Sequence, residues 1–462
     1  MIRLPPTATR MDRLPRCAWL AKLSRQGYEL RIGDWVECPE GFVAEGAWAG
    51  DFSAGGCRSS PFRSGSGILF HEPLTIFAPT HPLHPVFVFV TDGFECIASN
   101  SLALLLAAHP EALPDDLGGA WRGRVGDGLR GFRRYFRSLY RNSAGEMRQL
   151  AWGCLELDLD ARRMTEISPF VESAEAPFST FAGYRDHLVE ILRSTSANAS
   201  DERRRRRYER LVSTVSVGYD SAACAALSRA AGCVDTVTLT TARGGWADSG
   251  AAVAAALGMR VREYAREATL LERRADENHF LPPDVFGPED VEFLAEPNTA
   301  NDLVFAPFAD ELAGTIFVTG FHGGQMWSRG CPSGPEIIRR DNSGAGMNEF
   351  RLRVGFVHLV APFIGAHHAG AISAITESAE LEPYRVDYAY DKPIARRILE
   401  ESGVPRSAFG RIKVAGSAHV RRTSDDFAAA FGRRIAAYGE ALGTMASEPL
   451  AAAGRPGPEV RR

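Results

Sequence analysis

Leu211-Val-Ser-Thr-Val-Ser-Val217 is a run rich in β-branched residues that leads directly into Gly218-Tyr-Asp-Ser221 and the alanine-rich segment 222–231. The first run is typical of a strand and the alanine-rich segment of a helix, so we expect a strand-to-helix turn at residues 216–221. The free N–H groups of a first helical turn and the positive end of the helix dipole make such a turn an anion site. Gly218 permits close approach of a ligand to the backbone, which favours a phosphate cradle.

The side chains of this turn fit the same chemistry. Ser216 and Ser221 can donate hydroxyl hydrogen bonds, and Asp220 can hold a Mg²⁺ ion that bridges phosphate oxygens. The alternative is an ordinary turn in which Asp220 and Ser221 only cap the helix, and the hexapeptide alone does not decide between the two. It is not a Walker A loop, because GxxxxGK[ST] occurs nowhere in the chain.

Strands and helices alternate on both sides of this turn. Periodicity predicts helices at 184–196 and 247–257 and further strands at 234–241, 259–264 and 315–319. Such alternation is typical of βαβ units and a parallel sheet.

Residues 1 to about 170 differ, because short apolar runs there are broken by Gly, Pro and Ser, with one helix at 101–108. We therefore predict an α/β chain with a β-rich α+β domain over 1–175 and a parallel-sheet domain over 176–446. The Ala/Gly/Pro/Arg tail over 447–462 is predicted to be disordered.

The composition is that of a globular protein. With 45% hydrophobic and 24% charged residues, disorder of the whole chain of 462 residues is excluded. A net charge of -4 argues against nucleic acid as the main partner, and the apolar runs are too short to cross a bilayer. Eight cysteines without a CxxC pair predict neither a disulfide framework nor a zinc site. We expect a cytoplasmic protein without a membrane partner.

Two local features leave alternatives open. The basic run Arg203–Arg207 is either a solvated turn ahead of the strand or a contact for phosphate or RNA. The adjacent His367 and His368 favour surface or packing roles over metal binding, since neighbouring side chains on a regular element diverge.

The turn and the segments that follow it resemble the asparagine synthetase superfamily. Ser216-Val-Gly-Tyr-Asp-Ser221 is similar to the S-G-G-x-D-S pyrophosphate loop of that family, whose members cleave ATP to AMP and pyrophosphate while activating a carboxylate. Further similarities follow in the family's order as far as about residue 420, at Val237–Ala242, Ala247–Gly258, Glu296–Pro297, Ile316–Gly324, Ala361–Ile364, Lys392–Arg396 and Arg411–Lys413. The resemblance implies an ATP-pyrophosphatase fold with ATP and Mg²⁺, and nucleotide contacts from Val215, Ser216, Gly218, Asp220, Ser221, Leu239, Thr240, Thr319 and Gly320.

The resemblance also implies two catalytic roles. Asp220 would hold Mg²⁺, and Lys413, which matches the lysine of the family's R-P-K segment, would stabilise charge that develops near the α-phosphate. The alternative for Lys413 is a surface position. The residues expected to hold the metal depart from the family pattern. Thr319–Trp327 offers glycine and glutamine where the family has its second metal-holding acid, and Gly365 stands where the family has Asp.

A pair of tyrosines precedes the lysine of the K-x-x-L-R-like segment. Tyr388 and Tyr390, with Asp387 and Asp391, either place an acid–base group near the amine or only pack.

The N-terminal part resembles the family's glutaminase domain in outline. Val88–Asp92 and Ala98–Leu106 are similar to its F-A-S-E-x-K-A-L-L stretch, but the chain begins Met1-Ile2 without a cysteine nucleophile. Without that thiol glutamine cannot be opened as a thioester, so ammonia from glutamine is not expected. The resemblance implies a degenerate Ntn-hydrolase-like scaffold, as in β-lactam synthetases and lasso-peptide cyclases.

Two functions from different classes follow. The first is an ATP-dependent amide-bond-forming synthetase or cyclase that adenylates a carboxylate of a small-molecule or peptide substrate in specialised biosynthesis, as a homodimer or with a biosynthetic partner protein. The second is a catalytically decayed relative that serves as a binding or scaffold partner. A third, minor alternative is another ATP-pyrophosphatase chemistry, such as tRNA or base modification.

Overall fold

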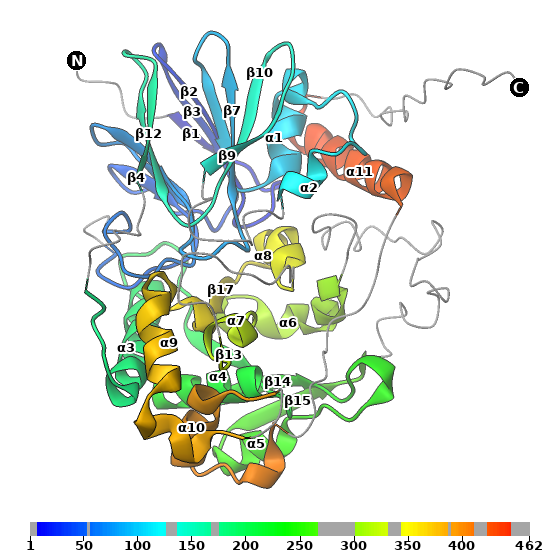
Figure 1. Cartoon of the computed structure of the whole chain (residues 1–462). Helices are drawn as coiled ribbons and strands as arrows, with labels where there is room; N and C mark the ends of the chain where they lie inside the picture. Colours follow the sequence, from blue (N-terminus) through cyan, green and yellow to red (C-terminus); the bar gives the residue numbers. More distant parts are fainter. Residues whose placement is uncertain are drawn as a thin grey trace, which may run out of the picture.

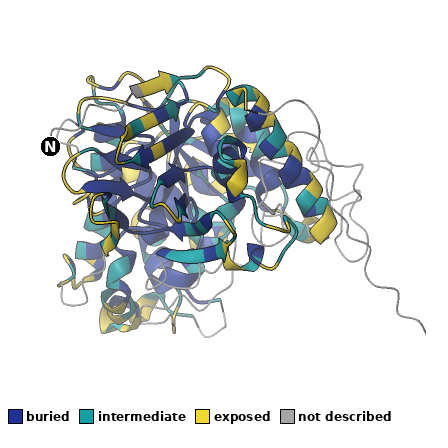
Figure 2. Cartoon of the chain, turned by 90° about the horizontal axis from the view of Figure 1, so that it is seen from above, coloured by how far each residue is buried: buried dark blue, intermediate teal, exposed yellow. Residues whose placement is uncertain are grey.

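The computed structural model describes residues 7–52, 56–125, 136–167, 175–266, 301–330, 343–386, 390–410 and 423–444. Three sheets organise these residues, and helices cover them (Figure 1). One sheet is mixed, one is antiparallel and one is entirely parallel, which confirms the α/β class. Buried residues fill the interior, whereas exposed residues gather on outer loops and helix faces (Figure 2).

Two stacked sheets form the N-terminal unit, residues 7–167. The seven-stranded sheet has the order β1-β3-β2-β8-β7-β10-β9, and only β1 and β3 pair in parallel. Its strands are β1 Thr7–Arg10, β2 Trp19–Ser24, β3 Gly27–Ile32, β7 Val86–Thr91, β8 Cys96–Ser99, β9 Phe136–Arg141 and β10 Gly145–Leu150. The antiparallel five-stranded sheet has the order β12-β11-β6-β5-β4, with β4 Phe42–Ala44, β5 Gly67–Leu69, β6 Leu74–Phe77, β11 Cys154–Asp158 and β12 Arg163–Ile167.

Apolar side chains of the two sheets pack against each other. Leu30 of the larger sheet and Ile76 of the smaller one belong to the same buried cluster. Helix α1 (Leu102–Ala108) covers the other face of the larger sheet, beside the short helix α2 (Arg122–Val125). The last described helix, α11 (Ser424–Leu442), packs on α1 although it follows the C-terminal unit in sequence (Figure 1).

The C-terminal unit, residues 175–410, is a doubly wound parallel sheet with the order β15-β14-β13-β16-β17. The strands are β13 Arg210–Thr214, β14 Asp235–Leu239, β15 Arg260–Tyr264, β16 Thr315–Thr319 and β17 Val357–Val360. Side chains alternate across it, so Ile316 and Val318 join the cluster on one face and Phe317 joins the cluster on the other.

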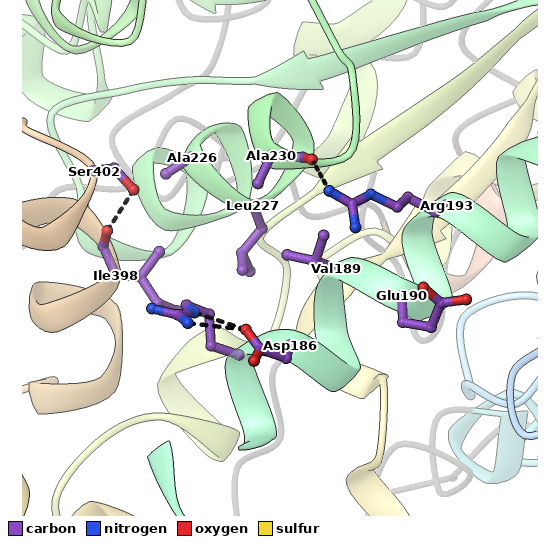
Figure 3. A pocket seen from close by; sticks show the side chains of 10 residues that line it. Asp186, Val189, Glu190, Arg193, Ala226, Leu227, Ala230, Ile398 and Ser402 are labelled. Atoms are coloured by element: carbon purple, nitrogen blue, oxygen red, sulfur yellow. Dashed lines mark hydrogen bonds and ion pairs between the residues drawn. The ribbon is translucent and has the colours of Figure 1, made fainter. Parts of the chain in front are cut away.

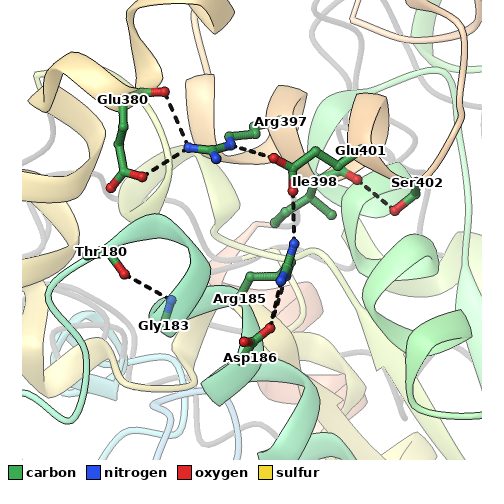
Figure 4. Close-up of polar contacts among 9 residues, drawn as sticks. All are labelled: Thr180, Gly183, Arg185, Asp186, Glu380, Arg397, Ile398, Glu401 and Ser402. Atoms are coloured by element: carbon green, nitrogen blue, oxygen red, sulfur yellow. Dashed lines mark hydrogen bonds and ion pairs between the residues drawn. The ribbon is translucent and has the colours of Figure 1, made fainter.

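Helices cover both faces of this sheet. One face packs against α3 (Phe181–Ala199), α4 (Tyr219–Ala230), α5 (Ala251–Ala256), α9 (Ala369–Glu377) and α10 (Pro393–Glu401). The other packs against a 3₁₀ segment (Asn301–Phe308) and α8 (Asn348–Val354), with α6 (Ala309–Leu312) beside them. Exposed ion pairs join α3 to α10, since Arg185 contacts Glu401 at 2.9 Å, and Glu401 also accepts from Arg397 at 2.7 Å (Figure 4).

The basic run Arg203–Arg207 joins the two units. Arg205 and Arg206 pair with Asp34 of the N-terminal unit at 3.1 and 2.8 Å, and their N–H groups donate to Glu37. The guanidinium of Arg204 is buried and lies 5.4 Å from the ring centroid of Trp48. Neither predicted role describes the run fully, because Arg205 and Arg206 form ion pairs within the protein and Arg204 is buried.

Candidate functional site

The predicted turn lies at the point where the connections of the parallel sheet change direction. From β13 the chain proceeds to β14 and β15 on one side, and it later returns to β16 and β17 on the other. Ligands of open parallel sheets bind beyond the carboxyl ends of the strands at such a switch point. Residues 215–218 leave the carboxyl end of β13 there and enter α4, as the sequence predicted.

Hydrogen bonds within the turn fix its shape. The Ser216 and Ser221 hydroxyls are 2.6 Å apart, and the Gly218 N–H donates to Ser216 Oγ at 3.1 Å. Gly218 is the N-cap in an extended conformation, so the first turn of α4 begins at Tyr219 with Asp220 inside it. The two serines and Asp220 therefore share the amino-terminal end of α4, where the helix dipole favours an anion.

Glycines bring β16 and α7 (Gly323–Met326) against Asp220. A Cβ atom on Gly320 would lie 2.5 Å from the carbonyl carbon of Asp220, and one on Gly323 would lie 2.5 Å from its carboxylate. Gly320 thus lies next to the turn. Thr319 precedes it, but its hydroxyl lies 2.9 Å from Nε2 of His358 rather than facing the serines.

The other predicted nucleotide contacts are Val215, at the start of the turn, and Leu239 and Thr240, at the carboxyl end of the neighbouring strand β14. The Val215 N–H donates to the Val237 carbonyl at 3.0 Å, which aligns the start of the turn with β14. Leu239 is buried in the core on the α8 side of the sheet. Thr240 offers its carbonyl to the N–H of Asp248 at 3.1 Å, so it shapes the segment after β14.

Lys392, the residue before α10, holds the carboxylate of Asp220. Its ammonium nitrogen lies 2.6 Å from Oδ1 and 2.5 Å from Oδ2, and its side chain is only 4% exposed. Although α4 and α10 are far apart in sequence, their amino-terminal ends meet here. Lys392 is therefore a cation that the described residues place at the turn, whereas Lys413, which the resemblance places near the α-phosphate, lies outside them and stays a prediction.

Tyr219, Tyr390 and Arg396 form a cluster of aromatic and basic side chains beside the Asp220–Lys392 pair. The Tyr219 N–H donates to the Tyr390 hydroxyl at 3.4 Å, and the Lys392 ammonium lies 5.3 Å from the Tyr390 ring centroid. Burial raises the pKa of Tyr390 above its ordinary value. Arg396 of α10 hydrogen-bonds the Tyr219 hydroxyl. Tyr390 thus contacts the turn, whereas Asp391 is buried within 3.8 Å of Arg329.

Asp248 is a functional candidate that the sequence analysis did not single out. It accepts hydrogen bonds from the Val217 N–H and the Ser216 hydroxyl, and burial raises its pKa to about 6. Its Oδ1 has no hydrogen-bond partner among the described residues. The signal available in the sequence was its place after β14, because neighbouring parallel strands bring their carboxyl ends to one edge.

Some predicted residues cannot be placed. Lys413, with Arg411, lies outside the described residues, as do Glu296, Pro297 and the 387–389 segment with Asp387 and Tyr388. The predicted disordered tail, 447–462, lies outside them as well.

Metal-binding clusters are absent from the part of the chain that the structure describes, where no three His, Cys, Asp or Glu side chains are arranged to hold an ion. The rings of His367 and His368 lie 4.0 Å apart between centroids and pack near Phe178. Burial lowers the pKa of His367 to about 4. Their packing agrees with the role that the sequence favoured.

A separate pocket of about 390 Å³ opens between α3, α4 and α10 (Figure 3). It is lined by the carboxyl-terminal half of α4, including Leu227 and Ala230, and by Val189 and Arg193 of α3. Arg193 donates to the Ala230 carbonyl at 2.8 Å. With a rise of about 1.5 Å per residue, Leu227 lies roughly 10 Å along α4 from Asp220, so this pocket is distinct from the predicted turn.

Compared with models of protein families and with curated protein sequences, the chain matches none of them. Within the described ranges, no helix is long and apolar enough to span a bilayer.

Proposed function

We propose that this protein is an ATP-dependent amide-bond-forming synthetase that places the ATP phosphates on the turn 216–221. The observation that carries the proposal is the position of this turn: two serines, a helix amino terminus and a buried lysine converge at the switch point of a parallel sheet. The resemblance of the turn and of the segments after it supplies the reaction class.

The proposed reaction has two balanced steps. A substrate carboxylate oxygen attacks the α-phosphorus, the bond to the β-phosphate breaks, and pyrophosphate leaves. A substrate amine then attacks the acyl carbon, the C–N bond forms, and AMP leaves with the electrons of the C–O bond while the amine gives up a proton. Ser216, Ser221 and Lys392 would hold the phosphates through hydroxyl and ammonium donors, and these fixed donors would stabilise the charge on the departing pyrophosphate.

An assay of AMP formation tests the activity. Purified protein is incubated with ATP, candidate acids and candidate amines, and AMP and pyrophosphate are quantified together. Equal amounts of both are expected with an accepted acid, and ATP hydrolysis to ADP would contradict the proposal. Incubation with glutamine in place of the amine should release no glutamate above background.

Two serine substitutions in different places test where the nucleotide binds. Ser221→Ala should weaken binding of a non-hydrolysable ATP analogue about 10-fold or more, in the range for one hydrogen bond to a charged group. Ser402→Ala, in the α3–α4–α10 pocket, is the matched control and should bind like the unmodified protein. If only Ser402→Ala weakens binding, the nucleotide site is misplaced.

A second candidate function is a binding or scaffold role without turnover. The observation that favours it is that the described α7 contributes no acid beside Asp220, whose carboxylate is already engaged by Lys392. This alternative predicts that ATP binds with the same dependence on Ser221 but that no acid and amine pair yields AMP.

A further inference from the structure

The carboxylate of Asp220, whose side chain is 25% exposed, has close neighbours on several sides at the place where the family resemblance implies a bound Mg²⁺. Both of its oxygens face the Lys392 ammonium at 2.5–2.6 Å. On another side, α7 approaches so closely that even a methyl group on Gly323 would lie 2.5 Å from the carboxylate. The Tyr390 ring flanks the ammonium from a third direction.

This arrangement does not fit a magnesium ion held by Asp220. Mg²⁺ requires oxygen ligands at about 2.0–2.1 Å in near-octahedral geometry and keeps several of its waters, so it needs free volume around the carboxylate. A metal on either oxygen would also lie beside the Lys392 ammonium, and the two cations would repel each other. In the described part of α7, Gly323, Gly324 and Gln325 supply no second carboxylate to offset that repulsion.

The Lys392 ammonium has a donor to spare. An ammonium group carries three N–H donors, and Asp220 takes two of them. Among the described residues the structure shows no third acceptor for Lys392. A phosphate oxygen at the mouth of the turn can therefore take the third donor while Asp220 keeps the ammonium in place.

We infer that Lys392 replaces the metal ion at this site. The site takes a polyphosphate anion, either pyrophosphate or the phosphate tail of a nucleotide, through the Lys392 ammonium and the turn, without a metal held by Asp220. Asp220 is then a positioning residue for Lys392. The inference rests on the proposed function only for the location of the phosphates.

The experiment measures pyrophosphate binding by calorimetry, once in EDTA and once with Mg²⁺. The proteins are the full chain, Lys392→Met, Asp220→Asn and the double variant, with Lys22→Met on β2 as the matched lysine control. The double variant leaves no unpaired charge, so its thermal melting shows whether weaker binding in Lys392→Met reflects misfolding.

The inference predicts that the full chain binds pyrophosphate in EDTA. Lys392→Met and the double variant should bind it about 10-fold more weakly or worse, whether or not Mg²⁺ is present, because a charged donor is lost. Asp220→Asn should bind with little change, because its amide oxygen still accepts from the Lys392 ammonium and keeps it in place, and Lys22→Met should bind with none. If binding requires Mg²⁺ and Asp220→Asn abolishes it, Asp220 is a metal ligand and the inference is wrong.

The same samples separate this inference from the proposed function. Metal-free binding through Lys392 without AMP formation from any tested acid and amine would support the inference and contradict the synthetase proposal. AMP formation together with strictly metal-dependent binding would support the synthetase proposal and contradict the inference. Absence of pyrophosphate binding under both conditions would contradict both.

Discussion

Mild acid should destabilise this protein through histidines that are buried between its two units. His81 and His84 follow β6 and meet His358 of β17, and all three are buried. His84 Nε2 lies 2.8 Å from His358 Nδ1, and the His81 and His84 ring centroids are 5.1 Å apart. Burial lowers the pKa of His81 to about 3 and holds the other two well below 6.5, and nearby Arg351 acts in the same direction.

The sign and size of the effect follow from linkage. Because the folded-state pKa of His81 lies below the unfolded value of 6.5, the unfolded chain binds the proton more tightly. The stabilising contribution is therefore complete above pH 6.5 and is lost as the pH falls from 6.5 towards 3. In that window one such imidazole lowers the free energy of unfolding by about 1.4 kcal/mol per pH unit, or by about 2 kcal/mol between pH 7 and pH 5. A typical domain has only about 5–15 kcal/mol of stability.

Urea unfolding at pH 7, 6 and 5 measures this slope. His81→Phe removes one titrating ring and keeps an aromatic group that can pack on Phe363, whose centroid lies 6.5 Å from that of His81. This variant should recover about 2 kcal/mol of the stability that the unmodified chain loses between pH 7 and pH 5. His71→Phe, at an exposed position, should leave the loss unchanged. If His81→Phe loses as much stability as the unmodified chain, His81 is not held neutral in the folded state.

Two further substitutions test the packing of the site and of the interface between the units. Gly320→Ala should weaken binding of an ATP analogue in calorimetry, because a Cβ atom there would lie 2.5 Å from Asp220. Gly432→Ala is the control and should bind normally, because its Cβ atom would lie 4.0 Å from the nearest neighbour. Equal binding by the two variants would contradict the close approach of Gly320 to Asp220. Glu45→Gln and Arg351→Met each break a fully buried ion pair with 2.5 Å between Nη1 and Oε2, so each should cost about 3–5 kcal/mol in urea unfolding. The double variant should cost less than the sum, and strict additivity would show that the pair is not formed.

The core of the C-terminal unit was predictable from local sequence. Strands at 210–214 and 315–319 and the helix at 219–230 lie where hydrophobic periodicity and β-branched residues indicated them. The turn between β13 and α4 followed from the same pattern, because a strand that passes directly into a helix leaves few residues for the connection. By contrast, β17 (Val357–Val360) was missed, since a strand of four residues, three apolar and one histidine, gives little periodicity.

The partners of the turn were not predictable in the same way. Lys392 pairs with Asp220 across 172 residues, and no local pattern reports which lysine the helix packing will bring to a carboxylate. Resemblance pointed first to Lys413, which lies outside the described residues, and named Lys392 only as the next candidate. Asp248 was quoted only as part of a similar segment, because its contact with Ser216 depends on how β14 aligns with β13. Sequence therefore located the strand-to-helix turn and Asp220, whereas the side chains that contact them from distant segments depend on tertiary packing.

The histidine cluster and the turn are joined through β16, so acid should act on both. His358 holds the hydroxyl of Thr319 at 2.9 Å, and the next residue, Gly320, abuts the backbone of Asp220. A cation on His358 would carry an N–H at both ring nitrogens, so it could only donate to the Thr319 hydroxyl and to His84 Nε2. Protonation would also place a buried positive charge near Arg351 at the end of β16, which forms the wall against which Asp220 is set. Loss of polyphosphate binding should consequently begin at the same pH as loss of stability, and His81→Phe should shift both to lower pH together.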